Sequence, residues 1–154
     1  MKGKLNFLCV LMLLLMAVQV VMTFVMGADA FAEGWREGRN AGPANTWEAL
    51  LGVIAGLVVV IAAIVSFVCF LRFILNVNSN EVFVWDNVSL LRLTGIGLLV
   101  VVLIISGDEL IDGRSFSSVL DKYTDMLIFS VFNLIVAEAF AIGLRLKQEQ
   151  DLTI

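Results

Sequence analysis

Long apolar runs separated by short polar stretches make up this chain. A helix needs about 20 apolar residues to cross a bilayer. Four runs reach that length, at residues 5–26, 47–75, 88–106 and 124–144. None of them alternates between apolar and polar positions, as the strands of a transmembrane barrel would. The pattern therefore predicts an all-α fold, a polytopic transmembrane four-helix bundle that forms one membrane domain over residues 1–154 with a short tail at 145–154.

The first and second runs need separate comment. Lys2 and Lys4 precede the first run, and Ala28-Asp29-Ala30 follows it, which is also the layout of a signal peptide. The apolar part of a signal peptide usually has about 7–15 residues, and this run is longer, so we expect a membrane span and keep cleavage as the alternative. The second run is overlong, so it should tilt or project from the bilayer.

The basic residues predict the orientation of the spans. If the N-terminus lies inside, six Lys and Arg residues fall in inner segments and four in outer ones. The bias has the sign of the positive-inside rule, so we expect both termini to be cytoplasmic. The inner residues are Lys2, Lys4, Arg72, Arg92, Arg145 and Lys147, and the outer ones are Arg36, Arg39, Arg114 and Lys122.

Composition narrows the chemistry. The chain is 60% hydrophobic and has a mean hydropathy of +1.00. Its formal net charge of −4 gives direct nucleic-acid binding little electrostatic basis. It contains no His, so a His metal site and a Ser-His-Asp triad are excluded. Because Gly-rich phosphate loops and nucleophile elbows are also absent, we predict no enzyme, no cofactor and no bound metal.

Charged residues inside the apolar runs are the candidate functional residues. Glu138 lies within the last run, where an ionised side chain at mid-span costs about 2.5–3.5 kcal/mol. Arg92 and Arg72 belong to the same inner half, so Glu138 can pair with either. We predict an intramembrane charge cluster of these three residues that fixes helix order. The alternatives are a proton or cation path through Glu138, and a switch or partner contact.

Small and acidic residues suggest two further features. Gly52 and Gly56 form a small-xxx-small pair that Ala63 continues, and such faces allow close helix packing in lipid. The contact could lie within the bundle or between two copies in a homo-oligomer. The outer group Asp108-Glu109-x-x-Asp112 reads as a solvated acidic loop, with a divalent cation site as the weaker alternative. Asn87 is expected to cap the third span and Ser118 the fourth.

A resemblance rests on two motifs. The C-terminal stretch Ala137-Glu138-Ala139-Phe140, then Gly143, then a Glu-x-Asp-Leu-Thr tail, resembles the ending of a family of small four-helix bacterial membrane proteins of unknown function. The inner loop agrees, with Phe83, Asn87, Leu91-Arg92 and Gly95 in the family's Phe-x-x-x-Asn-x-x-x-Leu-Arg-x-x-Gly spacing. The long first outer loop departs from that family. The resemblance implies a multi-pass protein of the bacterial inner membrane, from a family whose members are often encoded beside a Cro/C1-type helix-turn-helix regulator.

Two hypotheses follow for function. In the first, the protein is a regulatory or interaction protein that presents its inner loop and tail to a cytoplasmic partner, such as that regulator. Its expected contact residues are Phe83, Asn87, Glu149, Asp151 and Leu152. In the second, it is a small oligomeric proton or cation transporter or channel that uses Glu138. Few intramembrane charges make a poor pore, so the first is preferred.

Overall fold

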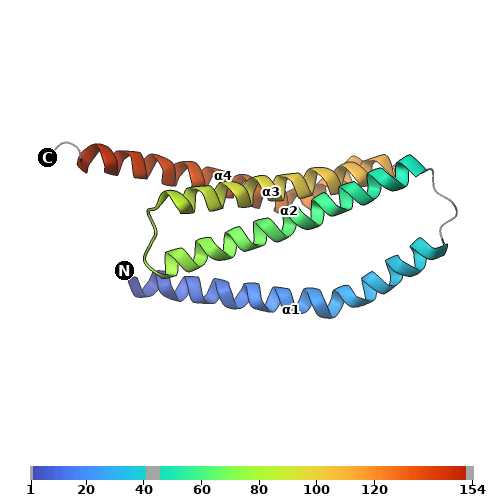
Figure 1. The fold of residues 1–154 in the computed structure, drawn as a ribbon, viewed down its shortest axis with the longest axis horizontal. Coiled ribbons are helices and arrows are strands. Elements are labelled where there is room, and N and C mark those ends of the chain that lie inside the picture. Colours follow the sequence, from blue (N-terminus) through green and yellow to red (C-terminus); the bar gives the residue numbers. More distant parts are fainter. Residues whose placement is uncertain (1, 41–45, 152–154) are drawn as a thin grey trace. The chain divides into compact units, whose positions relative to one another are not determined.

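The computed structural model describes residues 2–40 and 46–151, and within them the chain is helical, with short connections and no strand. Four helices follow one another along the chain (Figure 1). The helical fold confirms the predicted all-α class, and all four helices are long and apolar enough to cross a membrane, as a multi-pass membrane protein requires. The helices are α1 (Lys2–Asn40), α2 (Thr46–Asn78), α3 (Trp85–Ile111) and α4 (Phe116–Asp151).

Each helix is longer than the apolar layer of a bilayer. At 1.5 Å per residue, α3, the shortest with 27 residues, spans about 40 Å, against a hydrocarbon thickness of about 30 Å. The ends of every helix therefore project beyond the hydrocarbon, or the helices tilt. The orientation of the termini stays a prediction.

The chain divides into two compact units, Met1–Ile54 and Ala55–Ile154. In the first unit, α1 continues without interruption past the first apolar run to Asn40. Its C-terminal part carries a stacked pair of rings, Phe31 and Trp35, with centroids 6.3 Å apart. The second unit holds most of α2, all of α3 and all of α4. It therefore contains both sequence motifs, the one in the α2–α3 region and the one at the C-terminus.

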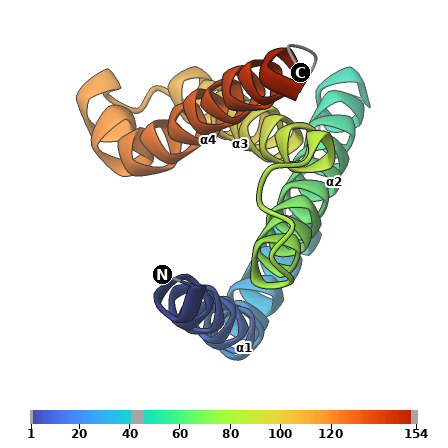
Figure 2. The ribbon, with the colours of Figure 1, turned by 90° about the vertical axis from the view of Figure 1, so that its left-hand side faces the viewer.

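Within the second unit, α3 and α4 lie side by side and antiparallel (Figure 1 and Figure 2). Ser130 of α4 donates a hydrogen bond of 2.8 Å to the carbonyl of Gly95 on α3. A Cβ atom at Gly95 would lie 2.7 Å from the side chain of Leu134, which is closer than real contacts allow. Glycine at this position therefore sets how closely the two helices approach.

α2 packs against α3 through a second close contact. Gly97 faces α2, where a Cβ atom would collide with the hydroxyl of Ser66 and lie 3.2 Å from the carbonyl oxygen of Ala62. The buried hydroxyl of Thr94 donates to the carbonyl of Leu90 at 2.9 Å, one turn back in its own helix. Small residues on α3 thus admit a neighbouring helix on each side.

The predicted packing face on α2 has no such neighbour among the described residues. Nothing lies within 4 Å of a Cβ atom built at Gly52 or Gly56, and Ala63 is exposed. Close helix packing in the second unit uses Gly95 and Gly97 instead. The small-xxx-small face of α2, which begins at Gly52 in the first unit, stays a prediction.

Both predicted helix caps were wrong in position. α3 is preceded by Val84, which makes no side-chain cap, and begins at Trp85, so Asn87 lies inside its first turn. α4 begins at Phe116, so Ser118 also lies within the helix, and its hydroxyl donates to the carbonyl of Ser115 at 2.8 Å. Apolar pattern marks the core of a span well but leaves its ends open, because caps depend on local backbone geometry.

The hydrophobic core of the second unit lies near the connection between α2 and α3. It consists of side chains from α3 and α4, with one aromatic ring of α2 packed against them. Ala137 and Ala141 are almost fully buried, so the small side chains of α4 face α3. The core residues are Val88, Leu91, Ala137, Ala141 and Leu144, and the partly buried residues against them are Phe73, Val136 and Phe140.

Candidate functional site

Asn87 organises the connection between α2 and α3. Its side chain is fully buried, and its amide nitrogen donates to the carbonyl oxygens of Glu81 at 2.6 Å and Val82 at 2.8 Å. Its side-chain oxygen accepts a hydrogen bond of 2.9 Å from Asn76 at the end of α2. Every polar atom of this amide thus has a partner within the connection. The structure therefore corrects the predicted partner contact at Asn87, because a buried side chain that holds its own loop is closed to another protein.

Phe83 fixes the same connection onto α4. Its ring stacks on Phe140, with centroids 5.4 Å apart. Phe73 of α2 meets the same Phe140 ring edge-on at 6.1 Å. A Cβ atom at Gly143 would lie 3.7 Å from the Phe83 ring, an ordinary van der Waals contact, so Gly143 lies opposite this ring. Phe83 remains 57% exposed, so part of its ring is open to a partner while the rest is held.

Arg92 and Glu138 form an ion pair between α3 and α4. Two nitrogens of the guanidinium contact the same carboxylate oxygen, Nε at 2.8 Å and a terminal nitrogen at 2.7 Å. The side chains are 42% and 61% exposed, so the pair lies on the outer side of the two helices rather than between them. Of the two alternatives for Glu138, the structure forms the pair with Arg92.

The depth of this pair follows from the register of the helices. Arg92 lies four residues inside the apolar run that begins at Val88, which is about 6 Å along a helix. An arginine side chain can reach the membrane interface from that depth, with its apolar stem in the hydrocarbon. The charge pair is thus near the boundary of the apolar layer, where its cost is below that of a mid-span charge.

Arg72 lies at a similar depth but apart from the pair. Asn76 meets Asn87, and Ser66 lies beside Gly97, so the intervening Arg72 falls near the level of Arg92. Its side chain is exposed, and it makes no hydrogen bond or ion pair with any residue that the structure describes. Of the three residues of the predicted charge cluster, Arg92 and Glu138 form an ion pair, and Arg72 lies at the same depth without contacting them.

α4 continues beyond the connection that Phe83 covers. From Gly143, opposite Phe83, the helix runs on to Asp151, which is about 12 Å further. Glu149 is exposed on this extension. Asp151 ends the helix, and Leu152 lies outside the described residues. The tail that was expected after residue 144 is thus a helical extension of α4 for most of its length.

A second polar cluster lies at the other end of the pair of helices. Glu109 of α3 accepts hydrogen bonds from Lys122 at 2.6 Å and from the Tyr123 hydroxyl at 2.9 Å, both on α4. Arg114 approaches the same carboxylate at 4.0 Å. The bond from Lys122 holds the pKa of Glu109 below its ordinary value of 4.5, and the same bond raises the pKa of Lys122 above 10.5.

The predicted solvated acidic loop does not describe Glu109, whose contacts with α4 were not predicted. The carboxylate is only 15% exposed, and it points to α4. The signal was present, since Glu109 follows the third apolar run while Lys122 and Tyr123 precede the fourth. Ends of successive antiparallel helices meet, so such residues come together. Among the described residues, no group of three or more acidic or cysteine side chains is placed to hold a metal ion.

The two sequence motifs meet in one place. Residues of the inner-loop motif lie on the connection and on the first turns of α3, and residues of the C-terminal motif lie opposite them on α4. We call this group the loop clamp. It consists of Phe83, Asn87, Arg92, Glu138, Phe140 and Gly143.

Comparison with known proteins places the chain at the level of a family. No curated protein and no solved structure matches it. The sequence pattern of one family, described as "Protein of unknown function (DUF2975)", matches residues 34–154. The matched part includes the whole second unit and therefore the whole loop clamp. The chain belongs to the DUF2975 family of proteins of unknown function.

Proposed function

We propose that the protein is a membrane-embedded regulatory or interaction protein that presents the α2–α3 connection and the extension of α4 to a cytoplasmic partner. The observation that carries the proposal is the loop clamp. Its contacts hold the short polar α2–α3 connection against α4, at the point where the helical extension of α4 begins. A rigid, partly exposed surface at one end of a set of membrane helices suits recognition by another protein.

The surface has two parts that differ in chemistry. Phe83 and Trp85 are 57% and 41% exposed and offer aromatic area on the connection. Beyond Gly143, the last two turns of α4 carry basic, acidic and amide side chains. Aromatic anchors beside a polar rim are typical of binding surfaces.

The resemblance to bacterial proteins encoded beside a Cro/C1-type regulator suggests the partner. We propose that both termini are cytoplasmic, that the membrane is the bacterial inner membrane, and that the partner is this helix-turn-helix regulator. The membrane protein would hold the regulator away from DNA or release it in response to a signal. No nucleic-acid contact by the membrane protein itself is required.

Capture of the purified regulator by the protein in nanodiscs tests the proposal. Deletion of residues 148–154 is expected to reduce capture at least tenfold, and Phe83→Ala should reduce it further. Replacement of Ser115 and Ser117 by Ala, at the start of α4 and just before it, at the opposite end of the helix pair, is the matched control and should leave capture unchanged. Equal capture by the deletion variant and the intact protein would refute the role of the extension.

Transport of protons or cations is a second candidate, because Glu138 is a carboxylate within an apolar run and is 61% exposed. The pair with Arg92 argues against this candidate, since the carboxylate is already held by a neighbouring side chain and would have to leave it to carry an ion. Flux assays in proteoliposomes decide this candidate. Flux that is lost in Glu138→Gln supports transport, and no flux with the intact protein removes the class.

A further inference from the structure

An apolar pocket opens between α3 and α4 at the end away from the loop clamp. Its volume is about 120 Å³, and residues of both helices line it. Val102 and Val119 form its base and are each 4% exposed, whereas Leu103 and Phe116 at its rim are 64% and 66% exposed. The pocket thus has a buried floor, walls from two helices and an open side.

The hydroxyl groups in the lining already donate hydrogen bonds to acceptors inside the protein. The hydroxyls of Ser106 and Thr124 donate to carbonyls of their own helices, at Leu103 and Leu120. The Tyr123 hydroxyl donates to Glu109 at 2.9 Å. All three donor hydrogens are therefore used inside the protein. A guest that needs no hydrogen bond fits this lining, and water, which needs two to four polar partners, does not.

The depth of the pocket in the bilayer further limits which molecules can bind in it. Of the two residues at its base, Val102 lies inside the third apolar run, which ends at Ser106, and Val119 lies before the fourth run, which begins at Thr124. The pocket therefore spans the boundary between hydrocarbon and headgroups. At this depth, the methylenes next to a lipid headgroup are the most abundant apolar groups in a bilayer.

We propose that this pocket binds one acyl chain of a membrane phospholipid, near its headgroup end. The pocket admits only a short part of the chain, because a cavity of about 150 Å³ is filled by a molecule the size of benzene. An empty pocket of this kind leaves its lining without contacts on one side, so a bound chain stabilises the ends of α3 and α4 against each other.

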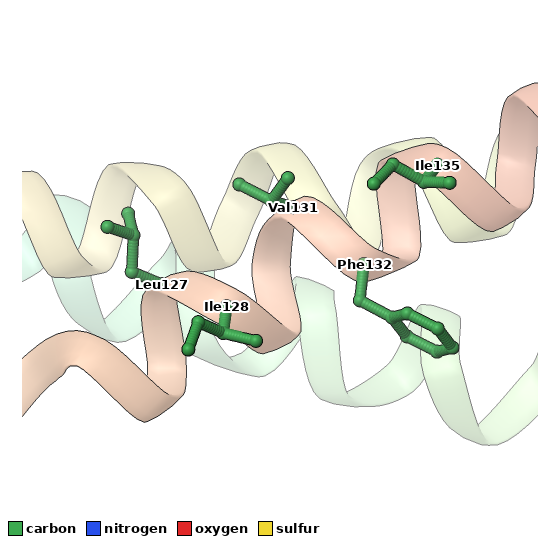
Figure 3. A pocket seen from close by; sticks show the side chains of 5 residues that line it. All are labelled: Leu127, Ile128, Val131, Phe132 and Ile135. Carbon is green, nitrogen blue, oxygen red and sulfur yellow. The ribbon is translucent and has the colours of Figure 1, made fainter.

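A second hollow shows what distinguishes this site from ordinary lipid contact. Figure 3 shows five apolar side chains, Leu127, Ile128, Val131, Phe132 and Ile135, that line a hollow on α4 alone. Ile128 and Ile135 there are 61% and 62% exposed. Lipid that passes along one helix exchanges freely, whereas the α3–α4 pocket encloses its guest between two helices.

Photolabelling tests the proposal with the full chain in nanodiscs that contain a phosphatidylcholine with a diazirine near the headgroup end of one chain. We expect saturable labelling of the pocket peptides, reduced at least fivefold by Val119→Phe, which fills the base. Leu103→Trp, which covers the open side without entering the buried floor, should do the same if the first variant fails to fold. Val131→Phe, on the hollow of Figure 3, is the control and should leave the pocket labelling unchanged.

Two results would overturn the assignment. Labelling that never saturates, spreads over α3 and α4 in proportion to exposure and survives both pocket variants means annular lipid only. Labelling of the pocket that free fatty acid displaces, but excess unlabelled phospholipid does not, means that the chain comes from another source.

Discussion

The ion pair of Arg92 and Glu138 gives the sharpest prediction. Both nitrogen contacts of Arg92 go to one carboxylate oxygen, so neutralising either residue removes the charge attraction from both contacts at once. Glu138→Gln leaves a guanidinium in the outer part of the apolar layer without its counter-ion. The replacement keeps the size of the side chain, so packing on α4 is preserved.

The magnitude follows from depth and exposure. A single charge at the centre of a bilayer costs about 2.5–3.5 kcal/mol, and a pair on a water-exposed surface gains only about 0.2–1 kcal/mol. The pair lies about 6 Å inside the apolar run and is roughly half exposed, so it falls between these limits. We expect Glu138→Gln to lower the free energy of unfolding by about 1–2 kcal/mol, with about 1 kcal/mol of coupling to Arg92.

A double-mutant cycle in mixed micelles measures that coupling. The unfolding free energies of Glu138→Gln, Arg92→Gln and the double variant are compared with the intact protein, and the double variant should lose less than the sum of the singles. Arg72→Gln is the matched control, because Arg72 lies at a similar depth without an ion pair to any described residue. A coupling of Glu138 to Arg92 no larger than its coupling to Arg72 would refute the assigned pair.

Three further predictions concern packing, the connection and pH. Gly97→Ala should lower the unfolding free energy by about 1–3 kcal/mol, because its Cβ would collide with the hydroxyl of Ser66 on α2. Gly56→Ala, where nothing lies within 4 Å of the new Cβ, should be neutral or stabilising, and thermal unfolding of the two variants compares them. Asn87→Ala should cost about 1–3 kcal/mol and speed amide hydrogen exchange in the 79–84 connection, and unchanged exchange would contradict its role. The contribution of Glu109 to stability should be present above pH 4.5 and disappear as the pH falls below that value, because its pKa is lowered in the folded state; that of Lys122 should be present below pH 10.5 and disappear above it, because its pKa is raised. Glu109→Gln should flatten both limbs of stability measured against pH, and unaltered limbs would show that the pair does not act.

The sequence determines the spans of this chain well and their ends poorly. Apolar runs must match the bilayer, so their positions on α2, α3 and α4 agree with the helices. Asn87 shows where this reasoning stops, because an amide at the start of a run fits equally a cap, a partner contact or a loop anchor. Only the path of the backbone at Glu81 and Val82 selects the last of these.

Contacts between helices could be predicted only in part. A carboxylate in an apolar run favours pairing with a cation, and Arg92 and Arg72 are the two candidates near Glu138. The choice between them depends on the rotation of the helices, which the sequence leaves open. The packing glycines show the same limit. Gly52 and Gly56 have the spacing of a helix contact, yet Gly95 and Gly97, two residues apart, make the close contacts by facing different neighbours.

The register of α3 and α4 has a consequence for how a signal can reach the end of the chain. It is fixed at three heights, by Glu109 with Lys122, by Gly95 with Ser130, and by Arg92 with Glu138. A piston movement of one helix turn, about 5.4 Å, would break all three at once. The three contacts therefore oppose sliding of one helix along the other, and under the proposed function a change at the α3–α4 connection would reach the extension of α4 as a tilt of the pair.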